Sequence, residues 1–258
     1  MKTWMGLLFC CWLVANAQAQ RSERLQALLI IGYESFGGVS DAKIQGMNRI
    51  GQLLEQHGVQ VHQYYHEAAE WDAIVETAKA CHLLVYAGHG LWLGGHGKAG
   101  GLCLRPSVSA ARIQRELKLR DQALVVFQSV CMGAGSSAGD DGDIGLAEAQ
   151  DRVRHYANPF FQIGAAAYYA NNYQDGALDF LRDFLTGTPL QAAYKASTQT
   201  WTTIEFEAAF EDDPNKLFSI ASRPGGGTAT RTTYTNGVKK VEEIPNPKSY
   251  NIAYVGPP

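Results

Sequence analysis

A histidine and a cysteine each follow a short apolar run, at the point where a buried strand is expected to end. His89 stands in the segment VYAGHG, and Cys131 stands in FQSVCMG. Either residue alone is a weak indication, because a single cysteine is more often a small buried apolar side chain. Together they supply a thiol that can attack a carbonyl carbon and an imidazole that can carry protons. The pair predicts a catalytic dyad, with Cys131 as the nucleophile and His89 as its acid/base partner.

Glycines lie next to both residues of the predicted dyad. Gly90 follows His89, and Gly133 comes shortly after Cys131. Residues without a Cβ atom let a substrate backbone approach closely and let amide N–H groups point at a developing oxyanion. We therefore expect the backbone amides of Gly90 and Cys131 to form an oxyanion hole.

The segments between residues 24 and 197 alternate between short apolar runs and amphipathic stretches. This alternation is typical of βαβ units, in which helices cover both faces of a parallel sheet. A helix is expected to begin at Asp41, and the other expected elements are strands at 25–32, 59–65, 82–88, 123–130 and 164–170 and helices near 71–78, 107–119, 144–156, 178–185 and 190–198. The predicted fold is an α/β three-layer sandwich with a mainly parallel sheet. The carboxyl ends of its strands would bring His89 and Cys131 to one crevice.

The N-terminal segment MKTWMGLLFCCWLVANAQAQ combines Lys2, an apolar run and small residues at Ala17 and Ala19. This pattern predicts a secretory signal peptide, and the run is shorter than the ~20 residues that span a bilayer. We expect cleavage after Ala19 and export to a periplasm, a cell surface or the extracellular space, with a membrane anchor as the alternative. At least one thiol must then lack a partner within the chain, because three cysteines remain: Cys81, Cys103 and Cys131.

The character of the chain changes after residue 200. The segment TATRTTYTNGVKKVEEI places Asn236-Gly237 between two alternating runs, which is a strong hairpin signal, and YNIAYVG at 250–256 favours one more strand. We predict a signal peptide at 1–19, a catalytic domain at 20–200 and a small C-terminal β extension at 201–258.

The two strand ends resemble those of the caspase-like superfamily of cysteine peptidases, which includes metacaspases, legumains, clostripain and gingipains. In these families one strand ends in His-Gly and the next in Gln, a small residue and Cys, and the corresponding segments here are VYAGHG and FQSVCMG. Ser40-Asp41-Ala42 is similar to the start of their first helix, and NPFFQIGAAAYYAN is similar to the last strand of gingipain-like domains. Val130 differs from the usual Ala or Ser. The likeness covers residues 25–198 and implies a caspase-like catalytic domain with His89 and Cys131 at its centre.

The same resemblance implies that the end of the last strand forms a wall of the S1 pocket, which makes Tyr169, Asn171 and Asn172 candidates for substrate binding. The segment 133–143 is rich in Gly, Ser and Asp and predicts a mobile loop. Asp140 and Asp141 in this loop could pair with an Arg or Lys side chain of a substrate. With Asp143 they could instead bind Ca²⁺, or form a solvated loop.

Composition and motifs exclude several function classes. The formal net charge is −3 and no long basic run is present, so no nucleic-acid partner is expected. His89 and His96 lack a standard metal-ligand spacing, so no metal site is predicted, and Ca²⁺ is the only cofactor considered. No phosphate loop, no GxSxG motif and no stable membrane span is predicted after the signal peptide.

The sequence therefore predicts an exported cysteine endopeptidase that acts on polypeptides, with a basic residue before the scissile bond as the expected preference. Two alternatives stay open. One is a catalytically silent caspase-like binding module, and the other is a thiol hydrolase that acts on substrates other than peptides.

Overall fold

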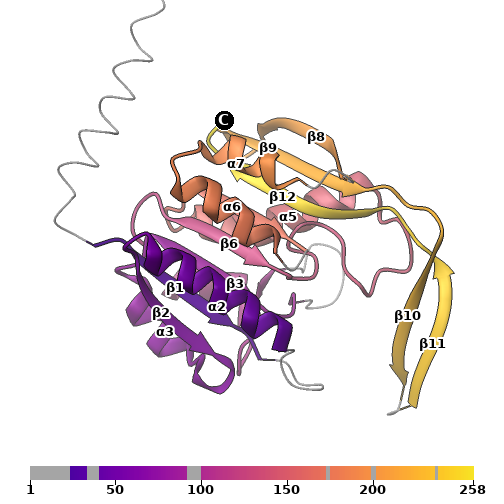
Figure 1. Ribbon diagram of the computed structural model, residues 1–258, viewed down its shortest axis with the longest axis horizontal. Coiled ribbons are helices and arrows are strands. Elements are labelled where there is room, and N and C mark those ends of the chain that lie inside the picture. The colour runs from indigo at the N-terminus through magenta and orange to yellow at the C-terminus, as the bar shows by residue number, and fades with distance from the viewer. Residues whose placement is uncertain (1–23, 34–40, 92–99, 173–174, 199–201, 236–237) are drawn as a thin grey trace, which may run out of the picture.

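The computed structural model describes residues 24–33, 41–91, 100–172, 175–198, 202–235 and 238–258 (Figure 1). The predicted signal peptide, His96 and the turn Asn236-Gly237 lie outside these ranges. In the described part of the chain, none of the helices has both the length and the apolar character needed to cross a membrane.

Five parallel strands form the first part of the central sheet, as the alternation of the sequence predicts. They lie in the order β2, β1, β3, β6 and β7. Their bounds are β1 (Gln26–Ile31), β2 (Gln60–Tyr65), β3 (Leu83–Ala87), β6 (Leu124–Gln128) and β7 (Ala167–Asn171). All strands but the edge strand β2 are buried almost throughout, because helices cover both faces of the sheet.

Helices lie on both faces, and alternate side chains of each strand point to opposite layers. In β1, Leu28 and Ile30 join one core while Leu29 and Ile31 join the other. The first core packs against α3 (Trp71–Ala78), α4 (Ala110–Glu116) and α5 (Gly145–Phe161), and the second against α2 (Asp41–Gln56), α6 (Gly176–Leu185) and α7 (Leu190–Ser197). The three-layer α/β architecture predicted from the sequence is therefore confirmed.

An aromatic cluster fixes the middle of the sheet beneath the predicted dyad. The ring of Phe127 in β6 lies 5.2 Å from that of Tyr86 in β3, 5.6 Å from Tyr156 in α5 and 5.3 Å from Tyr168 in β7. Tilted and edge-on contacts of this kind are the favoured geometry for aromatic pairs. They hold β3, β6 and α5 in fixed relative positions, and the loops after β3 and β6 start from this rigid base.

Three antiparallel strands complete an eight-stranded sheet: β12 (Ser249–Gly256), β9 (Asp213–Arg223) and β8 (Thr203–Phe210). β12 pairs with β7 on one side and with β9 on the other. The sequence predicts the strand at 250–256 as part of a separate extension, whereas the structure places it inside the central sheet. The hairpin of β10 (Thr228–Thr235) and β11 (Val238–Pro245) projects beyond the sheet, and its predicted pairing is confirmed (Figure 1).

Short elements fill the remaining connections. η1 (His66–Ala68) is a single turn of 3-10 helix between β2 and α3. β4 (Gly101–Leu102) and β5 (Val108–Ser109) pair as a small ribbon before α4. The Ser109 hydroxyl accepts a hydrogen bond from the Arg112 amide and so caps α4.

Candidate active site

The loops that follow β3 and β6 touch each other at the carboxyl edge of the sheet. A Cβ atom built on Gly90 would lie only 2.0 Å from the carbonyl oxygen of Cys131 and 2.8 Å from the Tyr156 hydroxyl. Only glycine therefore fits at this position without a backbone shift. His89 is exposed and Cys131 is partly exposed, so both are accessible to solvent. The structure thus places the two residues of the predicted dyad on adjoining loops.

The hydroxyl of Tyr86 holds the loop that carries His89 through hydrogen bonds. This hydroxyl donates a hydrogen bond to the His89 carbonyl oxygen at 3.1 Å and accepts one from the Cys103 amide at 2.9 Å. A Cβ atom on Gly88 would lie 2.4 Å from the same hydroxyl, so Gly88 is also required to be small. These contacts fix the backbone of His89 and leave its imidazole at the surface.

The backbone around Cys131 adopts an uncommon conformation. Ser129 has a φ of 54° and Met132 a φ of 66°, both in the left-handed region that residues other than glycine rarely occupy. The Ser129 amide donates to the Asn171 carbonyl at 2.7 Å, and the Met132 amide donates to the Ser136 carbonyl at 2.9 Å. Surrounding hydrogen bonds therefore hold a tight turn whose strain is typical of functional sites.

Two backbone amides beside the thiol, those of Gly90 and Cys131, are predicted to form an oxyanion hole. Within the described ranges, the N–H groups of Gly90 and Cys131 have no hydrogen-bond acceptor. Unpaired amides that point toward a common point can stabilise an oxyanion. The oxyanion hole at Gly90 and Cys131 stays a prediction.

Tyr156 in α5 lies directly beneath the contact between the two loops. It is fully buried, and its hydroxyl donates to the Leu91 carbonyl at 3.3 Å. Burial raises the pKa of Tyr156 well above its ordinary value, so the hydroxyl remains a donor at any physiological pH. Tyr156 therefore supports the loop after His89 and does not itself transfer protons.

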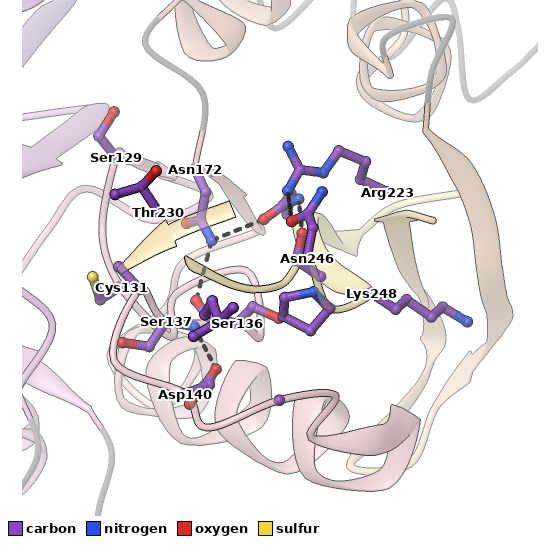
Figure 2. A pocket seen from close by; sticks show the side chains of 16 residues that line it. Ser129, Cys131, Ser136, Ser137, Asp140, Asn172, Arg223, Thr230, Asn246 and Lys248 are labelled. Atoms are coloured by element: carbon purple, nitrogen blue, oxygen red, sulfur yellow. Dashed lines mark hydrogen bonds between the residues drawn. The ribbon is translucent and has the colours of Figure 1, made fainter. Parts of the chain in front are cut away.

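A pocket of about 460 Å³ opens beside Cys131 (Figure 2). One wall is the loop after β6, with Ser129, Ser137 and Asp140, and Asn172 comes from the end of β7. The opposite wall is built from the base of the hairpin and its connections, including Arg223, Asn246 and Lys248. The pocket thus joins the parallel part of the sheet to its C-terminal strands. Of these residues, the sequence singled out only Cys131, Asp140 and Asn172.

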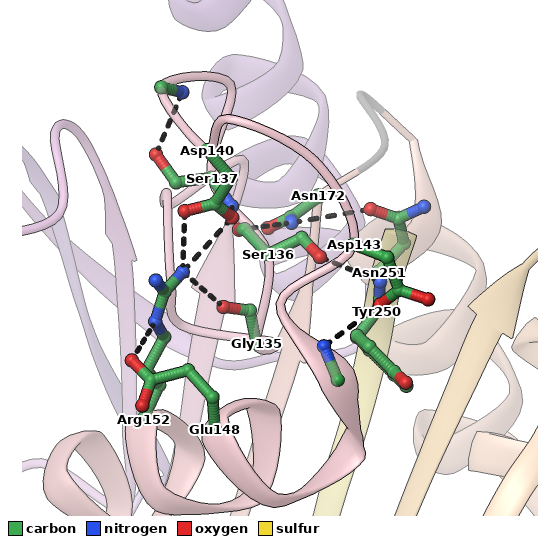
Figure 3. Close-up of polar contacts among 12 residues, drawn as sticks. Gly135, Ser136, Ser137, Asp140, Asp143, Glu148, Arg152, Asn172, Tyr250 and Asn251 are labelled. Carbon is green, nitrogen blue, oxygen red and sulfur yellow. Dashed lines mark hydrogen bonds and ion pairs between the residues drawn. The ribbon is translucent and has the colours of Figure 1, made fainter. Parts of the chain in front are cut away.

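The loop at 133–143 is anchored, in contrast to the mobile loop that its composition predicts. Arg152 in α5 is 8% exposed, and its Nη1 donates to the Asp140 carboxylate at 2.9 and 3.0 Å and to the Gly135 carbonyl at 3.1 Å (Figure 3). Its Nε donates to Glu148 at 2.8 Å. The predicted role of Asp140 in binding a basic substrate side chain conflicts with this geometry, because Arg152 already neutralises that carboxylate.

Ser136 ties the same loop to β12. Its amide donates to the Tyr250 carbonyl at 3.0 Å, and its hydroxyl accepts from the Tyr250 amide at 2.8 Å. Its carbonyl accepts from the Asn172 side chain at 3.1 Å (Figure 3). Asn172 therefore lines the pocket and braces the loop next to Cys131, and its role in substrate binding stays a prediction.

Tyr169 and Asn171 are not positioned to bind a substrate. Both are fully buried, and Tyr169 stacks on Phe180 at 4.0 Å in the core on the side of α6. The Tyr169 hydroxyl donates to Ser197 at 3.0 Å and accepts from the Asn171 side-chain amide at 2.9 Å. Their polar atoms are used in hydrogen bonds within the core, so neither residue belongs to the candidate site.

The remaining aspartates of the predicted acidic cluster do not converge. Asp141 is exposed and does not line the pocket, and the Asp143 carboxylate accepts a hydrogen bond from the Gly145 amide at 2.9 Å. In the described ranges, no group of three or more His, Cys, Asp or Glu side chains has the geometry to hold a metal ion. The acidic residues thus act here as ion-pair and turn-forming groups.

The three thiols differ in accessibility, and this predicts an order of alkylation. Cys81 is fully buried, its thiol donates to the Thr77 carbonyl, and burial raises its pKa to about 12. Since the thiolate is the reactive form, iodoacetamide at pH 8 should modify Cys131 well before Cys81, by at least about tenfold in rate. Peptide mapping by mass spectrometry measures this order. Equal modification of Cys81 in the folded protein would contradict it.

The chain was also compared with known proteins. Residues 13–150 match the family described as CHAT domain. Among solved structures, the Arg-specific cysteine proteinase gingipain R (RGPB) matches 90% of this chain at 16% sequence identity with a TM-score of 0.40. This chain spans only 60% of that protein. A structure of CapF with the inhibitor 3-isopropenyl-tropolone matches 89% of this chain and 94% of its own length, at 9% identity and a TM-score of 0.30. No curated protein matches the sequence.

Proposed function

Because the chain belongs to the CHAT domain family, a family of the caspase-like fold, we propose that it is a cysteine peptidase that hydrolyses peptide bonds with Cys131 and His89. The observation that carries the proposal is the contact between the Gly90 backbone and Cys131, beside a pocket and on a strained turn. The predicted signal peptide supports the further proposal that the enzyme acts on polypeptides outside the cytoplasm.

The proposed reaction has two stages. The Cys131 thiolate attacks the scissile carbonyl carbon, and the oxyanion that forms accepts hydrogen bonds from the amides of Gly90 and Cys131. His89 protonates the leaving amine, so that the C–N bond breaks and a thioester remains. His89 then removes a proton from water, which attacks the thioester and releases the carboxylic acid, so that the Cys131 thiolate and the protonated imidazole are restored.

Hydrogen bonds hold the backbone at both residues of the proposed dyad. The loop of His89 is fixed by Tyr86, and the turn of Cys131 is fixed by Asn171 and Ser136. A rigid frame lowers the entropy cost of reaching a productive geometry. The preference for a basic residue before the scissile bond is not part of the proposal, because its expected ligand Asp140 is paired with Arg152.

Peptide acyloxymethyl ketones test the proposal, because they alkylate a nucleophilic cysteine only after binding as a peptide. We expect a mixed set of such probes to label Cys131, and a mixed peptide library to be cleaved at a rate that falls in parallel with labelling. Labelling by iodoacetamide but by none of the peptide probes would favour a thiol hydrolase with another substrate. A chain that resists both reagents at Cys131 would be a binding module.

A further inference from the structure

The charged side chains of the pocket beside Cys131 are not all neutralised. Asp140 is paired with Arg152 at 2.9 Å, and Lys248 is paired with Glu205 at 2.7 Å. The hydrogen bond to Glu205 raises the pKa of Lys248, and the reciprocal bond lowers that of Glu205, so both stay charged and their charges cancel. The third charged residue of the pocket wall is Arg223, and it lacks such an ion-pair partner among the described residues.

Arg223 has a hydrogen-bond partner but no counter-charge. Its Nη2 donates to the Asn246 side-chain oxygen at 2.9 Å, while its Nε is buried without an acceptor. No carboxylate of the described residues lies within ion-pair distance of its guanidinium. A half-buried guanidinium without a counter-charge is unfavourable in the free protein, and an anion bound in the pocket would neutralise that charge.

The position of Arg223 is built by the base of the hairpin. Asn246 exchanges backbone hydrogen bonds with Gly226 at 2.9 Å and Gly227 at 3.0 Å, and its side-chain amide donates to the Gly226 carbonyl at 3.3 Å. A Cβ atom on Gly225 would lie 2.7 Å from the Lys248 amide, so the two connections are in close contact. The guanidinium is therefore held by a fixed frame and does not depend on a flexible surface loop.

We propose that Arg223 selects peptide substrates that carry an aspartate or glutamate side chain near the scissile bond. The inference rests on the proposed function and names its substrate class. Figure 2 shows Cys131 and Arg223 on opposite sides of the pocket, so a peptide attacked at Cys131 would place a neighbouring side chain near the guanidinium. The planar guanidinium can donate two parallel hydrogen bonds to one carboxylate, which distinguishes it from an amide of the same shape.

The test uses pooled fluorescein-labelled octapeptides in which one position at a time is fixed as Asp or as Asn. Binding is measured with the full chain carrying Cys131→Ala, and hydrolysis is measured with the wild-type chain. At one or two positions we expect the Asp pool to be preferred by at least about tenfold in both measurements. Adding Arg223→Gln should reduce the preference to less than about twofold.

Two further variants keep the test decisive. Lys248→Gln is the matched control, because its charge is already compensated by Glu205, and it should keep most of the preference. Arg223→Lys keeps the charge but loses the double hydrogen bond, so the preference should fall at least about threefold and remain above one. This variant decides the question if Arg223→Gln does not fold. An unchanged preference in Arg223→Lys, or an equal loss in Lys248→Gln, would overturn the inference.

The outcomes separate this inference from the proposed function. Equal cleavage of Asp and Asn pools by the wild-type chain would refute selection by Arg223 and leave the peptidase in place. Binding that prefers Asp and depends on Arg223, without cleavage by the wild-type chain, would support the anion site and refute the peptidase. Absence of both binding and cleavage would refute both.

Discussion

Replacement of either Cys131 or His89 by alanine is expected to lower kcat for peptide hydrolysis by at least about 10³. Without the thiol the proposed nucleophile is lost, and without the imidazole the proposed proton donor to the leaving amine is lost. His89 is exposed and Cys131 is partly exposed, so neither side chain anchors the core. The free energy of unfolding should therefore change by less than about 1 kcal/mol. Steady-state kinetics and urea unfolding measure the two effects.

The control for this experiment is Cys81→Ala. Cys81 is fully buried before β3, at the opposite end of the strand from His89, and it belongs to the core next to Thr77. Its replacement should cost some stability and leave kcat within about tenfold of the wild type. If Cys131→Ala keeps its activity, or if Cys81→Ala loses it in folded protein, the assignment of the nucleophile is wrong.

Arg152→Met should destabilise the protein by about 3 kcal/mol or more, the largest loss expected from a single charged side chain. The substitution removes the partner of two carboxylates, Asp140 and Glu148, whose side chains are 12% and 23% exposed. It also removes the hydrogen bond to the Gly135 carbonyl, so the loop next to Cys131 loses its anchor. Urea unfolding at pH 7 measures the loss.

A surface pair provides the comparison for Arg152. Arg182 forms an ion pair with Asp179 in α6, but the two side chains are 51% and 44% exposed. Arg182→Met should therefore change stability by no more than about 1 kcal/mol. Combining Asp140→Asn with Arg152→Met should cost less than the sum of the single changes, because each removes the same interaction. Strict additivity would show that the two side chains do not interact in solution.

The sequence predicts the five parallel strands and the helices around them because each of these segments has a strong periodic pattern. It does not predict β8 and β9, which lie at one end of the sheet. Nearly every residue of β8 is exposed or half-exposed, since it is the edge strand, and the first half of β9 is similar. The alternation of Ile204 and Phe206 with Glu205 and Glu207 is nevertheless a strand signal in β8 that the prediction missed.

The sequence predicts only those residues of the candidate site that follow buried strands. His89, Gly90 and Cys131 are visible in the sequence because they follow the ends of neighbouring buried strands, and Asn172 follows β7. Arg223 and Asn246 are not visible, because they reach the pocket only through the insertion of β12 between β7 and β9. The role of Asp140 is misjudged because its partner Arg152 lies in the following helix and composition alone does not reveal the contact.

Because β12 is the last of the described strands, the pocket beside Cys131 is completed late in synthesis. β12 lies between β7 and β9, and its Tyr250 holds the Ser136 loop beside Cys131. A nascent chain on the ribosome exposes the dyad long before residue 250 emerges. The parallel strands can assemble first, because their contacts are closer in sequence. The pocket wall can form only after β12 has been synthesised. Cys131 is therefore synthesised well before the substrate site is complete.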